Sequence, residues 1–283
     1  QHGRARRELR EITRFDLQAA VKYGVKKRAH NCRRTGQPRW QYTFGNIVYI
    51  TDESSKKEIT SFREPIHIQP ATITNKMLDN HREDRQILRE EPQICVTHSI
   101  VVIDQSGSMK TSDVTGFRNR SQAAYGILAL EYIAEQLHQR GDGKSLDAVS
   151  VIEMNDEATV VYDREPLDWI LFNKVLDRQK TAVPRSHGNY NSALQAAKQL
   201  IYNEILSFED ADPGERPSYA IIFLSDGRPS DGKPHENDLR NHILADIAGN
   251  LGSKLSLHTI GLGNSNEDFS TLRQMASWLN GFF

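Results

Sequence analysis

The pattern of apolar and polar positions divides the chain into two parts. From residue 96 onward, short apolar runs at 98–104, 218–225 and 255–260 alternate with longer amphipathic stretches. Such alternation predicts a parallel, doubly wound sheet with helices on both faces. We therefore expect residues 96–283 to form one α/β domain with a mostly parallel, Rossmann-like sheet. Its other expected elements are a hairpin pair at 149–152 and 159–162, helices at about 120–139, 167–178, 191–207, 236–251 and 268–279, and a last strand that begins at 281.

Residues 1–95 have a different pattern and are expected to form an accessory α+β unit with a basic arm. Helical spacing over 15–23 ends at Gly24, a residue common after helix ends. Alternating runs predict a β-hairpin with a polar turn. The expected elements after the helix are strands at 40–44, 47–51 and 57–62, a turn at 52–56, a further strand within 66–73, and a helix at 75–90.

The segment after the first apolar run carries the candidate chemistry. Four β-branched residues, Ile100 to Ile103, predict a strand buried on both faces. Asp104, Ser106 and Ser108 then follow at alternate positions. Ligands of open α/β sheets bind at the carboxyl ends of the strands. A carboxylate and two hydroxyls gathered there suit a hard cation such as Mg²⁺ or Mn²⁺.

The run Asp104-Gln105-Ser106-Gly107-Ser108 resembles the DxSxS motif of von Willebrand factor type A domains, in which it opens a metal-ion-dependent adhesion site. A second family element, an Asp after a later buried strand, is matched by Asp226. The family's Thr on an intervening loop would fall at about Gly188, so the chain departs from the pattern there. Ser186 or Asn189 could supply an oxygen instead, or a water could fill the place.

The resemblance implies a protein-binding function. In the family, the metal keeps residual positive charge, and a carboxylate from a partner protein completes its shell. The metal ligands expected here are Asp104, Ser106, Ser108, Asp226 and Ser186. The alternative is a set of turn residues that bond only to nearby backbone. His187 is expected to bond within its loop, because imidazole is a poor ligand for Mg²⁺.

Composition limits the class of protein. The 283 residues are 37% hydrophobic and 26% charged, with a formal charge of −1, which is typical of a soluble globular protein. No apolar stretch is long enough to span a membrane. The two cysteines, Cys32 and Cys95, have no metal-ligand spacing. The pair could form one disulfide, but two sparse cysteines fit a reducing compartment better, so we expect a cytoplasmic location.

Charge is concentrated near the start of the chain, where residues 1–40 hold twelve Lys or Arg against three acids. One interpretation is a solvated arm. The alternative function is docking on a nucleic acid or another anionic surface, with a vestigial metal site. Few aromatic residues precede Trp40, which argues against base stacking and leaves no strong nucleic-acid signal.

Catalysis is not expected. The DxSxS run lacks the second Asp of aspartyl-phosphate phosphatases, and the chain has no Gly-Lys-Ser/Thr phosphate loop. Gly261-Leu262-Gly263 lacks the third glycine of a dinucleotide loop. A metal-assisted hydrolase is the remaining enzymatic alternative.

Overall fold

The fold is taken from a computed structural model, which describes residues 7, 12–140, 146–207, 216–231, 251–264 and 266–283. The chain forms two compact units. Unit 1 comprises Gln1–His67 together with Ser112–Asn119, and unit 2 comprises Ile68–Thr111 together with Arg120–Phe283.

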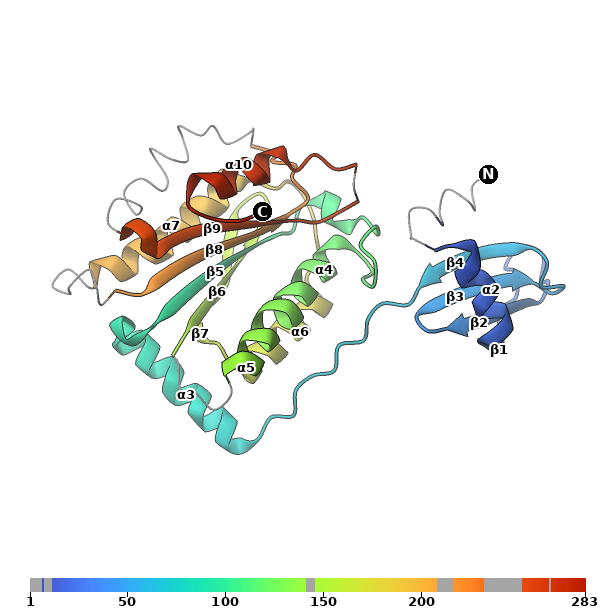
Figure 1. Ribbon diagram of the computed structural model, residues 1–283, viewed down its shortest axis with the longest axis horizontal. Helices are drawn as coiled ribbons and strands as arrows, with labels where there is room; N and C mark the ends of the chain where they lie inside the picture. The colour runs from blue at the N-terminus through green and yellow to red at the C-terminus, as the bar shows by residue number, and fades with distance from the viewer. Residues whose placement is uncertain (1–6, 8–11, 141–145, 208–215, 232–250, 265) are drawn as a thin grey trace. The chain divides into compact units, whose positions relative to one another are not determined.

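Unit 2 contains a five-stranded sheet in the order β7-β6-β5-β8-β9 (Figure 1). Its strands are β5 (Thr97–Asp104), β6 (Ala148–Met154), β7 (Ala158–Pro166), β8 (Ser218–Ser225) and β9 (Leu255–Gly261). Strands β6, β5, β8 and β9 are parallel, and β7 is antiparallel to β6. The expected mostly parallel α/β sheet is therefore confirmed.

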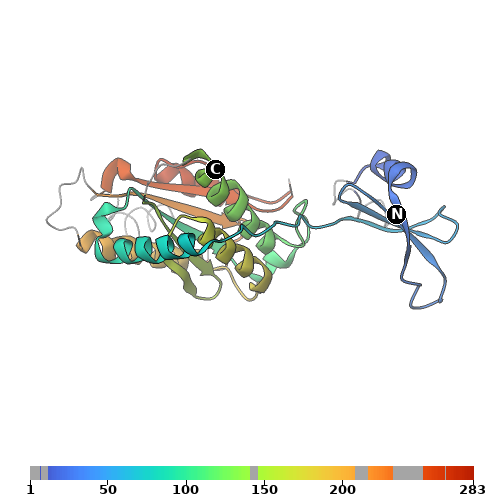
Figure 2. The same ribbon diagram turned by 90° about the horizontal axis from the view of Figure 1, so that it is seen from below.

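Strand β5 lies at the centre of this sheet because its side chains are apolar on both faces. Ile100 to Ile103 are all fully buried. Ile100 and Val102 belong to a cluster with residues of β8, β9 and two helices, α7 (Tyr190–Leu206) and α10 (Ser270–Trp278). The opposite face is covered by α4 (Arg120–Ile127), η3 (Leu128–Ala134), α5 (Glu135–Arg140) and α6 (Trp169–Thr181), as Figures 1 and 2 show.

The chain leaves β5 toward β6 on one side, and β8 lies on the other side with β9 beyond it. This reversal of direction makes the β5–β8 junction the topological switch point of the sheet. Ligands of doubly wound folds bind above that junction, at the carboxyl ends of the strands. The fold therefore brings Asp104 and Asp226 to one edge.

Two elements expected in unit 2 differ in the structure, and a third falls on residues that the structure does not describe. The single helix expected at 120–139 changes to π-type hydrogen bonding over Leu128–Ala134. The strand expected from Gly281 does not form, although Thr259 N–H donates to the Phe282 carbonyl oxygen at 2.9 Å. The helix expected at 236–251 falls almost wholly on residues outside the described ones.

Helix α3 (Asn75–Glu90) belongs to unit 2 and not to the N-terminal unit. The first boundary between the compact units lies between residues 67 and 68. The sequence pattern had placed this boundary between residues 95 and 96. Buried His81 explains the attachment: its Nδ1 lies 2.7 Å from the Asp168 carboxylate, and its Nε2 lies 3.2 Å from that of Glu165. The strand expected within 66–73 does not form. Short 3₁₀ turns complete the unit at η1 (Pro92–Ile94), η2 (Gly107–Lys110) and η5 (Gly252–Lys254).

Unit 1 is an antiparallel sheet with one helix on it. Strands β1 (Val25–Ala29), β2 (Arg39–Phe44), β3 (Ile47–Asp52) and β4 (Glu58–Arg63) pair in chain order, and α2 (Arg14–Tyr23) precedes them. Thr13 and Asp16 form a capping box at the start of α2. Leu17 of the helix packs on Ile47 and Tyr49 of β3. The expected helix and the three expected strands β2–β4 are confirmed.

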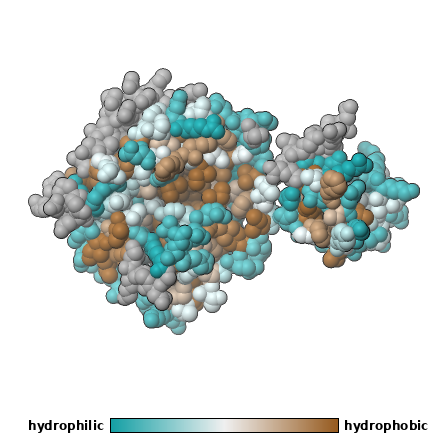
Figure 3. Space-filling model, viewed as in Figure 1, coloured by the Kyte–Doolittle hydropathy of each residue, from teal (hydrophilic) through white to brown (hydrophobic). Residues whose placement is uncertain are grey.

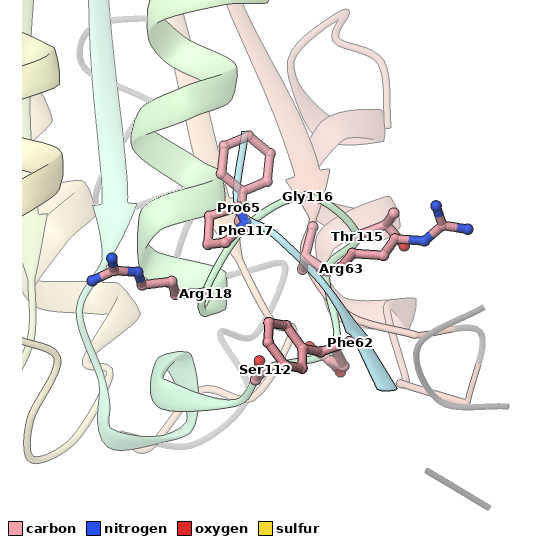
Figure 4. Close-up of a pocket in the computed structure, with 10 residues that line it drawn as sticks. Phe62, Arg63, Pro65, Ser112, Thr115, Gly116, Phe117 and Arg118 are labelled. Atoms are coloured by element: carbon pink, nitrogen blue, oxygen red, sulfur yellow. The ribbon is translucent and has the colours of Figure 1, made fainter. Parts of the chain in front are cut away.

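The segment Ser112–Asn119 groups with unit 1, although it follows the DxSxS segment in sequence. Ile66 N–H donates to the Gly116 carbonyl oxygen at 2.6 Å. Gly116 has φ +85°, and a Cβ there would come within 2.6 Å of the Ile66 side chain. This segment and the end of β4 enclose a cavity of about 310 Å³, which Figure 4 shows with Phe62, Pro65 and Phe117 in its wall. The positive φ favours glycine at residue 116, because other residues rarely adopt this backbone conformation.

Candidate metal centre

The candidate site lies where β5 and β8 end side by side. Ile103 pairs in parallel register with Leu224, so the residues that follow each strand emerge together. Asp104 ends β5, and Asp226 follows the last residue of β8. Both aspartates are fully buried. The sheet therefore supplies two carboxylates at the switch point, as the sequence predicted.

The loop that follows β5, which we call the first loop, holds one oxygen of the Asp104 carboxylate, and strand β8 holds the other. Ser106 N–H donates to Oδ1 at 2.7 Å, and the Ser225 hydroxyl donates to Oδ2 at 2.6 Å. The Oγ atoms of Ser106 and Ser108 lie 3.0 Å apart. Ser106 is buried and Ser108 half-buried, so the three DxSxS side chains extend from the core toward solvent. The structure brings them together.

Burial governs the electrostatics of this carboxylate. It raises the pKa of Asp104 to about 6, while the hydrogen bonds from Ser225 and Ser106 act in the opposite direction. The nearby negative charge of Asp226 adds to the upward pKa shift of Asp104. The ionised form of Asp104 therefore lacks full compensation from its protein surroundings.

The loop between α6 and α7, which we call the third loop, lies directly against the first loop. A Cβ on Gly188 would meet Asp104 Oδ1 at 3.3 Å and the Ser106 Cβ at 3.2 Å. Gly188 is fixed by Ser230, whose Oγ accepts from its N–H at 3.0 Å and whose N–H donates to its carbonyl at 2.9 Å. The position at which the family's Thr was expected thus borders the carboxylate, but it contributes no side chain.

Ser186 and His187 contact a different group. The hydroxyl of Ser186 and the ring of His187 both bond to the exposed carboxylate of Asp156, whose pKa they lower. The His187 Nδ1 lies 2.8 Å from Asp156 Oδ1. Ser186 reaches the first loop through its carbonyl oxygen, which accepts from Gly107 N–H at 3.0 Å. A metal role for the Ser186 hydroxyl stays a prediction. The expectation that His187 bonds within its own loop is wrong, because its partner Asp156 lies 31 positions away in the turn between β6 and β7.

Asp231 fixes the third loop from the β8 side. Its carboxylate accepts from Tyr190 N–H at 3.1 Å and from Asn191 N–H at 2.8 Å, which caps the start of α7. Asn189 makes no cap bond with its side chain and donates to the Asp156 carbonyl at 2.8 Å. The first loop, the third loop and the loop that follows β8 are therefore joined by hydrogen bonds around Asp104.

The sequence interpretation missed Arg120, the first residue of α4. Its side chain is 2% exposed, and its guanidinium donates to Asp226 Oδ2 at 2.9 Å and to Glu267 Oε1 at 2.5 Å. Glu267 also accepts from the exposed Arg228. Gly263 leaves room for this arrangement, because a Cβ there would lie 3.0 Å from Arg120 Nη2. Asp226 is thus neutralised by an internal cation.

The sequence analysis also did not identify Tyr190 and Ser225, which form a hydrogen-bonded chain to Asp104. Tyr190 Oη lies 2.6 Å from Ser225 Oγ, which in turn donates to Asp104. Ser225 is buried at the end of an apolar strand. A buried hydroxyl needs a hydrogen-bond partner. The Ser at the end of an apolar run was therefore the one signal in the sequence that indicated this chain of bonds.

The donor set fits a hard cation better than a transition metal. Asp104, Ser106 and Ser108 supply oxygen only, and Asp226 lies at the adjoining strand end. No group of three or more His, Cys, Asp or Glu side chains is placed to hold a metal among the residues that the structure describes. A metal at this edge would therefore depend on hydroxyl as well as carboxylate oxygens, a donor set that suits Mg²⁺ or Mn²⁺.

No family model and no curated protein matches the chain. Solved structures are similar to it at low identity. An aerotolerance-related membrane protein from Bacteroides fragilis is 15% identical, with a TM-score of 0.44, over 66% of this chain and 89% of that one. A von Willebrand factor type A protein from Catenulispora acidiphila is 14% identical, with a TM-score of 0.42, over 84% and 41%.

The manganese-loaded TRAP protein of Plasmodium vivax is 13% identical, with a TM-score of 0.41, over 65% of this chain and 63% of its own. The chain spans about two fifths of the Catenulispora protein and less than two thirds of TRAP. The fold assigned to unit 2 follows from its own strand order. Among the described residues, no helix is both long and apolar enough to cross a bilayer.

Proposed function

We propose that unit 2 is a protein-binding module that depends on a divalent cation, Mg²⁺ or Mn²⁺, at the β5–β8 edge. Asp104, Ser106 and Ser108 would hold the ion, with Asp226 beside it. These residues would hold an ion that, when bound, would attract a carboxylate of a partner protein. The observation that carries the proposal is the convergence of these oxygen side chains around one buried carboxylate at the switch point.

The chain's own residues prepare the site in two ways. Asp104 is held at both oxygens, so its orientation is set before any ion arrives. Gly188 leaves the space next to that carboxylate without a side chain. Hydroxyl ligands add no negative charge, so a bound ion keeps attraction for an incoming carboxylate.

Calorimetric titration of the metal-free chain with MgCl₂ and MnCl₂ tests the ion. We expect binding heat in the parent protein and none in Asp104→Ala, whose circular dichroism spectrum should stay that of the parent. Asp79→Ala is the matched control, because Asp79 is an aspartate with 72% of its side chain exposed on α3. Equal heats in the parent and in Asp104→Ala would contradict the proposal.

The proposal assigns binding and not catalysis. Acetate can serve as the simplest carboxylate probe, since it should bind the metal-loaded parent weakly and leave the metal-free chain untouched. Turnover of a phosphate ester that disappears in Asp104→Asn would instead favour the metal-assisted hydrolase.

A further inference from the structure

Unit 1 carries a strongly basic hairpin that the metal site does not use. Residues 25–40, from β1 to the start of β2, contain six Lys or Arg and no Asp or Glu, whereas the whole chain has a formal charge of −1. The six are Lys26, Lys27, Arg28, Arg33, Arg34 and Arg39. We call this segment the basic hairpin.

Among the described residues, no carboxylate neutralises the cations of the basic hairpin. None of the six forms an ion pair with a carboxylate in the part of the chain that the structure describes. Asp52 lies across from Arg39, but its carboxylate accepts from Ser54 and from the N–H groups of Lys56 and Lys57. Five of the six cations are exposed, and Arg39 is half-buried.

The loop between β1 and β2 forms a cleft of about 610 Å³ that contains three of these arginines. Its lining residues are His30, Asn31, Cys32, Arg33, Arg34 and Arg39, without an acid among them. Two hydrogen bonds close the loop: Cys32 N–H donates to the Gln37 carbonyl at 2.9 Å, and Gly36 N–H donates to the Cys32 carbonyl at 2.8 Å. Three arginines and no acid thus line a concave surface that can receive an anion.

The strand beside the cleft extends the positive surface. β1 is an edge strand, and Lys26, Lys27 and Arg28 on it are all exposed. The Lys26 ammonium lies 4.3 Å from the ring centroid of Trp40 and 5.5 Å from that of Tyr42, so its position is fixed by the rings. Figure 3 shows hydrophilic residues around the rim of the visible face of unit 1.

We propose that the basic hairpin binds the phosphodiester backbone of a nucleic acid, without base specificity. Nucleic acids offer a high and regular density of negative charge, which suits cations spread from β1 into the cleft. The Trp40 ring is already covered by Lys26, so contacts to phosphates are favoured over base stacking. A membrane surface fits less well, because Val25 is the one large apolar side chain exposed in the hairpin and supplies little to insert.

Fluorescence anisotropy of a labelled single-stranded RNA of about 20 nucleotides, titrated with the full chain over a range of salt, tests the proposal. The test variant is Arg33→Gln/Arg34→Gln, which alters two exposed loop residues. Two lost phosphate contacts should weaken binding about 25-fold at 0.1 M salt and reduce the salt slope by about 1.4. The matched control is Arg82→Gln/Lys180→Gln, whose side chains are 73% and 62% exposed on unit 2; its affinity should equal the parent's.

Cys32 gives a second measurement on the unmodified chain. Hydrogen bonds from Thr35 lower the pKa of its thiol to about 7, so it should react with iodoacetamide at neutral pH. Cys95 is 3% exposed, and burial raises its pKa to about 12, so it serves as an unreactive internal control. RNA bound over the cleft should slow alkylation of Cys32 several-fold.

Three results would overturn the proposal: no binding to RNA or to duplex DNA, equal affinity of the parent and Arg33→Gln/Arg34→Gln, or binding only to anionic phosphatidylserine vesicles. EDTA and Asp104→Ala should leave RNA binding unchanged. The test is therefore independent of the metal site, and failure of one proposal does not imply failure of the other.

Discussion

Replacing Arg120 by Met should strongly lower the free energy of unfolding of unit 2. It should also increase the stabilisation that unit 2 gains from Mg²⁺. The guanidinium lies between Asp226, which is fully buried, and Glu267, whose side chain is 9% exposed. Glu267 keeps Arg228 as a partner, but Asp226 loses its ion pair. Removing one member of a buried ion pair costs about 3–5 kcal/mol, because the other charge stays buried without compensation. Arg120→Met/Asp226→Asn should regain most of this loss.

Urea unfolding followed by tryptophan fluorescence measures the effect. In a Trp40→Phe background, the signal comes only from Trp169 and Trp278 of unit 2, so unfolding of unit 1 is silent. Arg82→Met, at an exposed ion pair, is the control and should change the free energy of unfolding by less than about 0.5 kcal/mol. Millimolar Mg²⁺ should stabilise Arg120→Met more than the parent. A loss below about 1 kcal/mol, or no extra response to Mg²⁺, would refute the reasoning.

Two further predictions concern stability. His81 hydrogen-bonds to carboxylates that raise its pKa to about 9 from 6.5. The stabilisation from protonated His81 should therefore be full below pH 6.5 and disappear as the pH rises through about 9. The free energy of unfolding should change by up to about 3 kcal/mol over this range. Urea titrations across the range should show this change in the parent and not in His81→Gln. Gly188→Ala should cost about 1 kcal/mol in the same assay, because its Cβ would lie 3.2–3.3 Å from Ser106 and Asp104; an unchanged midpoint would contradict this close contact.

The sequence predicted the framework of the site because that framework follows from local pattern. Ile100 to Ile103 indicated a strand buried on both faces, and the order of later runs indicated a doubly wound sheet, so Asp104 and Asp226 were expected at one edge. The Arg120–Asp226 pair was not predicted, because its members are 106 positions apart and no periodicity links them. One physical signal was present: a cation at a helix N-terminus is disfavoured by the helix dipole, so a buried Arg there requires carboxylates.

The charges around the site indicate which aspartate can bind a cation. Among the described residues, Asp226 and Glu267 are paired with Arg120 and Arg228, whereas Asp104 has only neutral hydrogen-bond donors and no cationic partner. An incoming divalent ion therefore gains most from Asp104, while at Asp226 it must compete with a guanidinium already in contact. We expect Asp104→Asn to abolish Mg²⁺ binding heat and Asp226→Asn to weaken the affinity without abolishing it. Equal losses in calorimetric titrations of the two variants would show that Arg120 releases Asp226 when the ion binds.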